Sequence, residues 1–200
     1  ADPKRQPLFN EPDPSYGGAV WGEVVPQLTG ANVAFAIRAR VVLLRDLGAA
    51  LSPFNAFQII QGLETVAIRM KQHCANAEKV VKFLETQKKV KNIIYPTNHQ
   101  GEIRERAKRY LSGGYGALVG IDLGTKETGA KFIDNLKLLY HVANIGDARS
   151  LAIHPATTTH SQLNDKQLAE AGVTPGYVRL SIGIEHPDDI IADIKQALAA

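Results

Sequence analysis

Residues 141–187 read HVANIGDARSLAIHPATTTHSQLNDKQLAEAGVTPGYVRLSIGIEHP, and this stretch indicates the fold more clearly than any other part of the chain. Short apolar runs alternate in it with loops rich in hydroxyl and amide side chains. The runs near 142–145, 151–153 and 177–184 are typical of strands, and 165–171 predicts a short helix. We therefore expect polar groups to gather above a sheet in this region.

The last of these strands contains a candidate anion-binding arginine. Apolar side chains alternate with the others along the strand, which places Val178, Leu180, Ile182 and Ile184 on one face and Tyr177, Arg179, Ser181 and Gly183 on the other. Arg179 thus leaves the core face beside a small serine and a glycine, which leave space above the sheet. Its guanidinium can donate two parallel hydrogen bonds to a carboxylate or phosphate. The strand alone also fits an ordinary solvated arginine.

Length and composition describe an ordinary globular protein. The 200 residues are 44% hydrophobic and 22% charged, which suits one domain or one and a half. A net charge of +3 with interspersed signs indicates neither a nucleic-acid partner nor an anionic membrane. The single cysteine, Cys74, excludes an internal disulfide, and no apolar run approaches the ~20 residues of a membrane span. We expect a cytoplasmic protein.

The first half of the chain predicts an extended segment followed by helices. Residues 1–31 have little periodicity and contain Pro3, Pro7, Pro12, Pro14 and Pro26, so we expect no regular element there. Residues 32–89 predict connecting helices. The first of these helices has about four turns and stops at Gly48. A long helix, or a pair of helices, then starts after Ser52-Pro53 and bends near His73-Cys74.

Residues 90–200 predict a carboxy-terminal α/β domain. Strands are expected at 90–95 and 117–123, and helices at 102–111 and 126–140. A closing helix starts at Pro187 and carries acidic residues in its first turn. With the strands described above, this order predicts an α+β layer in which helices pack on one side of a small, mostly antiparallel sheet.

Residue spacing excludes several chemistries. No histidine pair has the i, i+4 spacing of a helical zinc site, and no G-x-S-x-G elbow of a serine hydrolase is present. The glycine-rich run at 112–116 comes after a predicted helix, whereas a phosphate-binding loop comes after a strand. The candidates that remain are Asn144, the threonines at 157–159 and Arg179. Neutral donors and one cation recognise an anion but supply neither a nucleophile nor a base. A reaction would need a group outside this chain.

Longer stretches resemble a known family. They are LSPFNAFQIIQGLETVAIRMKQHCANA at 51–77, NIGDARSLAIHPATTTHSQL at 144–163 and YVRLSIGIEHPDDIIADI at 177–194, together with EPDPSY at 11–16. In this order they resemble the Cys/Met-metabolism family of pyridoxal-phosphate enzymes. The motifs NIGDARSL, TTTHSQL and GVTPGYVRLSIGIE are most similar to those of its O-acetylhomoserine sulfhydrylase branch.

The resemblance implies a fold-type I transferase. Residues 1–31 would close its large cofactor domain, 32–89 would connect, and 90–200 would be the small domain. It implies that Arg179 binds the α-carboxylate of the substrate, with Thr159 and Asn144 close by. Many relatives carry a serine where this chain has Asn144, so an amide or a backbone N–H could replace that hydroxyl. The lysine that binds pyridoxal phosphate would lie in a missing amino-terminal half.

The implied activity is γ-replacement in methionine biosynthesis. An intact homotetramer would convert O-acetylhomoserine and sulfide into homocysteine and acetate. Cystathionine γ-synthase and methionine γ-lyase are alternatives within the family. A binding or assembly fragment without catalysis is an alternative of another class, and the 200-residue chain alone is expected to be inactive.

Overall fold

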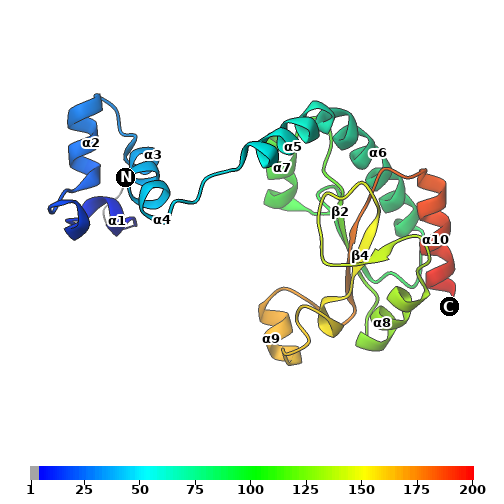
Figure 1. The fold of residues 1–200 in the computed structure, drawn as a ribbon. Helices are drawn as coiled ribbons and strands as arrows, with labels where there is room; N and C mark the ends of the chain where they lie inside the picture. Colours follow the sequence, from blue (N-terminus) through cyan, green and yellow to red (C-terminus); the bar gives the residue numbers. More distant parts are fainter. Residues whose placement is uncertain (1–4) are drawn as a thin grey trace. The chain divides into compact units, whose positions relative to one another are not determined.

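A computed structural model describes residues 5–200 (Figure 1). Two compact units divide the chain, the first ending at Gln61 and the second running from Gly62 to Ala200. This division lies inside the segment 32–89 that the sequence predicts as connecting helices. The domain boundaries at 31 and 89 stay a prediction about the intact protein.

The described part of the first unit is largely helical, so the expectation of an extended segment at 1–31 is wrong for residues 5–31. It contains α1 (Pro7–Asn10), a 3₁₀ turn at Pro14–Tyr16 and α2 (Trp21–Thr29). Pro7 and Pro14 lie in first turns, where the missing N–H is not required. Pro26 lies inside α2, and Pro3 lies outside the described residues. Pro7 and Pro14 therefore mark the starts of their helical turns, whereas Pro26 does not.

A small core holds this unit together. Trp21, Val25 and Ala34 are buried, and the Trp21 indole donates to Asp13 Oδ2 at 2.9 Å. The Tyr16 hydroxyl donates to the backbone oxygen of Val41 at 2.6 Å. The four-turn helix predicted after residue 32 is confirmed as α3 (Ala34–Arg38), a π-helical stretch at Ala39–Leu44 and α4 (Arg45–Leu47). It stops at Gly48, whose φ of 68° is left-handed.

Two helices follow, α5 (Pro53–Glu64) and α6 (Val66–Glu85). They are separated at Thr65, so the predicted bend near His73-Cys74 is wrong. Both His73 and Cys74 are buried inside an unbroken α6. The apolar residues on both sides of the predicted bend lie in the single helix α6, and its second half packs against the sheet.

The second unit is built on five strands in the order β1-β2-β5-β4-β3. They are β1 (Asn92–Ile94), β2 (Leu118–Asp122), β3 (Tyr140–His141), β4 (Leu151–Ile153) and β5 (Tyr177–Ser181). The β1–β2, β2–β5 and β4–β5 pairs are antiparallel, whereas β3 and β4 are parallel. The prediction of an α/β layer with a mostly antiparallel sheet is confirmed.

Two predicted boundaries near β3 are wrong. The helix expected to reach residue 140 is α8 (Lys126–Asn135), and the strand expected at 142–145 is β3. The buried carboxylate of Asp193 accepts hydrogen bonds from the backbone N–H groups of Lys137, Leu138 and Leu139 at 2.8–3.0 Å. These bonds turn the chain out of the helix and into the edge strand.

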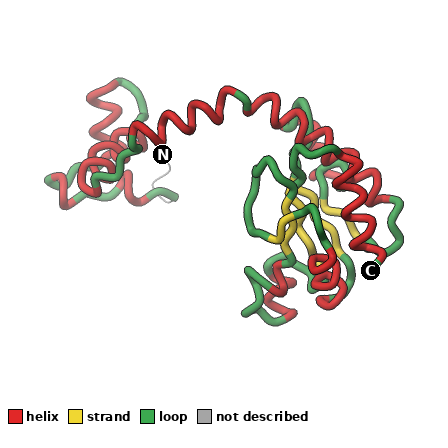
Figure 2. Tube along the Cα trace, turned by 45° about the vertical axis from the view of Figure 1, so that its right-hand side comes forward, coloured by secondary structure: helices red, strands yellow, loops and turns green. Residues whose placement is uncertain are grey.

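Helices α6, α8 and α10 (Pro187–Ala199) cover one face of the sheet. Figure 2 shows the strands in yellow beside the red helices of this unit. The shared core includes Val119, Ile121, Val178 and Leu180, all 0% exposed. The helices α7 (Gly101–Tyr110) and α9 (Asp165–Glu170) complete the unit. Within residues 5–200, no helix is both long and apolar enough to cross a lipid bilayer.

Candidate functional site

Arg179 lies in the central strand β5, on the face turned away from these helices. Its Cα is paired with Gly120 of β2 on one side and with Ile153 of β4 on the other. A Cβ built on Gly120 would come within 2.6 Å of the Tyr177 ring. The missing side chain therefore lets the ring of Tyr177 lie over β2, on the same face as Arg179.

The tyrosine contributes an apolar wall with a neutral hydroxyl. Burial raises the pKa of Tyr177 above its ordinary value, and the nearby Arg179 charge offsets part of that increase. Tyr177 therefore stays protonated at neutral pH, and its ring is partly buried.

The guanidinium of Arg179 is only partly used by the protein. Its Nη2 donates to the backbone oxygen of Asn144 at 3.3 Å. Its Nε is buried and has no hydrogen-bond partner within residues 5–200. No carboxylate of the described residues lies within ion-pair distance of it. A buried donor without a partner costs free energy, so this arrangement favours an anionic ligand at Arg179.

Asn144 approaches Arg179 as the resemblance implies, but through its backbone. Its side-chain Oδ1 accepts from the N–H of Ile145 at 2.9 Å, and the residue is exposed. The amide therefore shapes the loop 142–149, while the carbonyl faces the guanidinium. Its role in binding a substrate stays a prediction.

Thr159 is exposed and lies in a loop that follows the 3₁₀ turn Pro155–Thr157. Its hydroxyl is 2.8 Å from the Nδ1 of His160. Across the described part of the chain, no hydrogen bond joins Thr159 to Arg179 or Asn144. The structure thus brings two of the three predicted site residues together by direct contact.

His154 anchors the threonine loop, which is the segment that contains the threonines at 157–159. Its ring is 0% exposed, with Nε2 lying 2.8 Å from the oxygen of Pro175 and Nδ1 lying 2.9 Å from the Thr157 hydroxyl. A carbonyl can only accept, so Nε2 carries the proton and Nδ1 accepts from Thr157. Burial lowers the pKa of His154, which keeps the ring neutral.

Ser150 and Glu185 lie in the stretches 144–163 and 177–194 but were not predicted as site residues. Ser150 is 0% exposed, and its N–H and hydroxyl donate to the two carboxylate oxygens of Glu185. The burial of Ser150 is a tertiary feature that no local pattern in the sequence records. Its partner, 35 positions away, cannot be identified from spacing.

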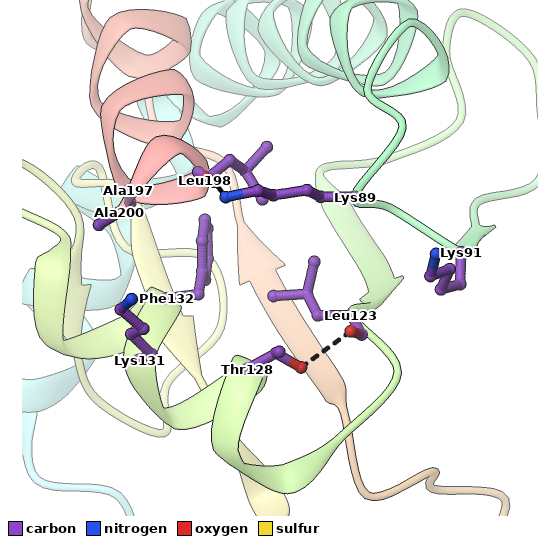
Figure 3. A pocket seen from close by; sticks show the side chains of 9 residues that line it. All are labelled: Lys89, Lys91, Leu123, Thr128, Lys131, Phe132, Ala197, Leu198 and Ala200. Atoms are coloured by element: carbon purple, nitrogen blue, oxygen red, sulfur yellow. Dashed lines mark hydrogen bonds between the residues drawn. The ribbon is translucent and has the colours of Figure 1, made fainter.

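A cavity of about 320 Å³ lies elsewhere in this unit, beside α8 and α10. Figure 3 shows Leu123, Phe132 and Leu198 around it, with lysines at its rim. Lys89 Nζ donates to the oxygen of Leu198, and the Thr128 hydroxyl donates to the oxygen of Leu123. Lys89 and Thr128 are already bonded, and the Lys91 and Lys131 side chains are exposed, so we assign no site there. Residues 5–200 also contain no cluster of side chains suited to bind a metal ion.

The comparisons with known proteins agree with the motifs. The family model described as Cys/Met metabolism PLP-dependent enzyme matches residues 19–199. The O-acetyl-L-homoserine sulfhydrylase of Leptospira meyeri is 50% identical over 195 residues, which are 95% of this chain and 44% of that protein. The homocysteine synthase of Schizosaccharomyces pombe is 44% identical, over 98% of this chain and 44% of that protein.

A solved structure is similar as well. The putative O-acetylhomoserine (thiol)-lyase of Campylobacter jejuni, crystallised with pyridoxyl-lysine monophosphate, matches with a TM-score of 0.81 and 42% identity. The match covers 96% of this chain and 44% of that one, so the chain spans less than half the length of these relatives. The family match extends over nearly the whole chain, and the chain belongs to the Cys/Met metabolism family of pyridoxal-phosphate-dependent enzymes.

Proposed function

We propose that the intact protein replaces the acetate of O-acetylhomoserine with sulfide to give homocysteine. In this proposal the described residues supply the part of the site that binds the α-carboxylate of the amino acid. The observation that carries it is the Arg179 guanidinium, whose Nε is buried without a protein partner on the open face of the central strand. The sulfhydrylase and homocysteine synthase names of the similar proteins support the substrate class.

The geometry around Arg179 suits the orientation of a substrate carboxylate more than the breaking of a bond. Arg179 rises from a strand paired on both sides, so its Cα is fixed by the sheet. Two parallel hydrogen bonds from a guanidinium fix both the position and the plane of a carboxylate. Orientation of this kind lowers the barrier because the bond to be broken is held at a defined angle. Asn144 would border the carboxylate with its backbone, and Thr159 would lie farther out.

Pyridoxal phosphate, when bound, supplies the electron sink for reactions of this family. Every lysine in residues 5–200 has an exposed side chain. A lysine that holds a cofactor covalently needs a desolvated environment to be reactive. The described residues do not fit that attachment, so we derive no step through the cofactor. We propose that the remaining half of the protein provides it.

The proposed assembly and compartment follow from the same resemblance. We propose a homotetramer in the cytoplasm, with each site completed by the amino-terminal half. The free thiol of Cys74, buried in α6, suits a reducing compartment. Light scattering on the full-length protein would give the mass of the assembly, and a dimer or monomer would contradict the tetramer.

The first test is Arg179→Ala in the full-length enzyme. An unpaired substrate carboxylate costs about 2–4 kcal/mol, which corresponds to a roughly 30- to 900-fold lower kcat/KM for O-acetylhomoserine. Homocysteine formation from O-acetylhomoserine and sulfide measures it. Arg106→Ala is the matched control, since Arg106 lies exposed on α7 and pairs with Glu102 at i,i+4. A wild-type kcat/KM in Arg179→Ala would reject the proposal.

The alternatives within the family separate by the acceptor and the products. Replacing sulfide with cysteine tests for cystathionine γ-synthase, and release of methanethiol from methionine tests for methionine γ-lyase. An assay of the 200-residue chain alone tests the binding or assembly fragment. Turnover by that chain would contradict the proposal that the other half is required.

A further inference from the structure

We propose that Ser150 and Glu185 are positioning residues that hold the loop 142–149 over Arg179 and thereby set the affinity for the substrate's α-carboxylate. This inference rests on the proposed function, because it concerns the same site. It adds two residues that touch neither substrate nor cofactor. They act through the loop that contacts the guanidinium.

The first observation is a clamp made by one serine on one carboxylate. The N–H of Ser150 donates to Glu185 Oε1 at 2.6 Å, and its hydroxyl donates to Oε2 at 2.9 Å. The same hydroxyl accepts from the N–H of Gly183 at 2.8 Å. Both oxygens of Glu185 are thus bonded to a residue that is 0% exposed. Bonds to a charged acceptor are stronger than neutral ones, so the clamp fixes the end of the loop.

The second observation is close packing of the loop on the chain that continues β5. The N–H of Ile184 donates to the oxygen of Ala148 at 2.8 Å. A Cβ built on Gly183 would collide with Ala148 O, with the Arg149 backbone and with the Glu185 carboxylate. The missing side chain of Gly183 therefore makes room for the loop, and the prediction that it leaves open space above the sheet is wrong.

The third observation is that the clamp is fixed to the core. Asn76 of α6 donates from Nδ2 to the oxygens of Gly183 and Glu185 at 3.0 and 2.8 Å. His73 of the same helix donates from Nδ1 to the oxygen of Ile182 at 2.6 Å. Both side chains are buried in α6, so the turn that carries Glu185 is held by a core helix.

The far end of the loop reaches the site. Asn144 O accepts from Arg179 Nη2 at 3.3 Å, while residues 142–146 are exposed. At the end next to Ser150, the Arg149 guanidinium lies 4.9 Å from the ring centre of Tyr140, which belongs to β3. Since the exposed part has few other anchors, releasing Ser150 would let Asn144 move away from Arg179.

The experiment compares Ser150→Ala, Glu185→Ala and Glu185→Gln in the full-length protein loaded with its cofactor. Three quantities are measured: hydrogen exchange of residues 142–149, the Kd of L-2-aminobutyrate, and kcat and KM for O-acetylhomoserine. L-2-aminobutyrate has the α-carboxylate but no leaving group. We expect faster exchange, and Kd and KM raised about tenfold, a size typical of residues that act through another. kcat should change less than threefold, and Glu185→Gln should lose less than Glu185→Ala.

Thr125→Ala is the control for stability alone, because Thr125 caps α8 through its own hydrogen bonds. It should lower Tm without changing Kd or the exchange of the loop. In an Arg179→Ala background, Ser150→Ala should add little to Kd, since the two residues act on one contact. Full additivity there would overturn the inference.

The remaining outcomes separate the two proposals. Unchanged exchange of 142–149 in Ser150→Ala would overturn the clamp. Faster exchange with wild-type Kd and KM would overturn its effect on the site. If Ser150→Ala weakens L-2-aminobutyrate while the wild type does not convert O-acetylhomoserine, the inference stands and the proposed reaction fails. If the wild type does not bind L-2-aminobutyrate, the carboxylate site and this inference both fail.

Discussion

The two faces of β5 differ in what covers them. On one face Val178 and Leu180 are 0% exposed, beneath side chains of α6, α8 and α10. On the other face Arg179 is half-buried, and its visible partner is a carbonyl from the exposed loop 142–149. Neighbouring residues of one strand therefore lie in unlike surroundings, because a strand alternates its side chains between two sides.

The coverings have different chemistry. Helices cover a sheet with side chains, since their backbone groups are bonded internally. A loop also presents free carbonyls and N–H groups, as Asn144 and Ser150 do here. The helical face thus supplies stability and the loop face supplies polar recognition. Three substitutions test how separate these two roles are.

The largest effect is expected on the helical face, from Leu180→Ala. Truncating a fully buried leucine leaves a cavity, so the free energy of unfolding should fall by about 2–5 kcal/mol. Urea denaturation of the chain measures it. The KM of the full-length enzyme should stay within about twofold of the wild type.

Ile184→Ala is the matched control for this substitution. Its side chain is 38% exposed just beyond the same strand, and the cost should stay below about 1 kcal/mol. A KM that rises with Leu180→Ala as steeply as stability falls would show that the two faces are not separable.

A smaller effect is expected on the loop face, from Gly120→Ala. The new Cβ would lie 2.6 Å from the Tyr177 ring and 3.1 Å from Ile94 Cβ, so the ring must move. We expect a loss of about 1–3 kcal/mol in unfolding free energy, and weaker binding of amino acids because Tyr177 borders Arg179. Tm and the Kd of L-2-aminobutyrate measure the two effects.

The Tyr177→Ala background should remove most of the cost of Gly120→Ala. Gly62→Ala is the control, because no atom lies within 4 Å of its Cβ position in α5. In a helix that change should stabilise the chain by about 0.5–1 kcal/mol. Equal stability of the wild type and Gly120→Ala would contradict the close contact with Tyr177.

The smallest effect is confined to acid pH and concerns His154. Burial lowers its pKa in the folded chain, so the unfolded chain binds more protons as pH falls. This group's contribution to stability is complete above its ordinary pKa of about 6.5 and is lost as pH falls below that value. Urea midpoints at several pH values between 5 and 8 should therefore decrease toward acid.

His154→Gln should flatten this dependence, because it removes the buried titrating ring. An unchanged slope in His154→Gln would show that the ring is not protonated on unfolding in this range. Loss of order in the threonine loop below pH 6 would connect the same protonation to the site.

The sequence predicted the strands whose alternation is regular. β5 and β2 could be placed because apolar residues recur with a period of two, and α10 because proline and two aspartates mark its start. The confirmed α/β layer follows from these elements. Arg179 could be placed on the open face for the same reason.

The rest depends on contacts that no local pattern records. α8 stops where Asp193, far along the chain, binds three backbone N–H groups. In the first unit, α1 and the 3₁₀ turn at Pro14–Tyr16 start at prolines, where the sequence suggested breaks. The pair of Ser150 and Glu185 joins two motifs that each look complete on their own.

The parallel pairing of β3 with β4 has a geometric consequence for the edge of the sheet. A chain that leaves His141 must travel back along the strand direction before Leu151 can run beside Tyr140. Figure 1 draws this return as the wide yellow-green excursion beside β4. Its length is therefore set by the distance it retraces. A deletion in it would detach the outermost strand from its neighbour.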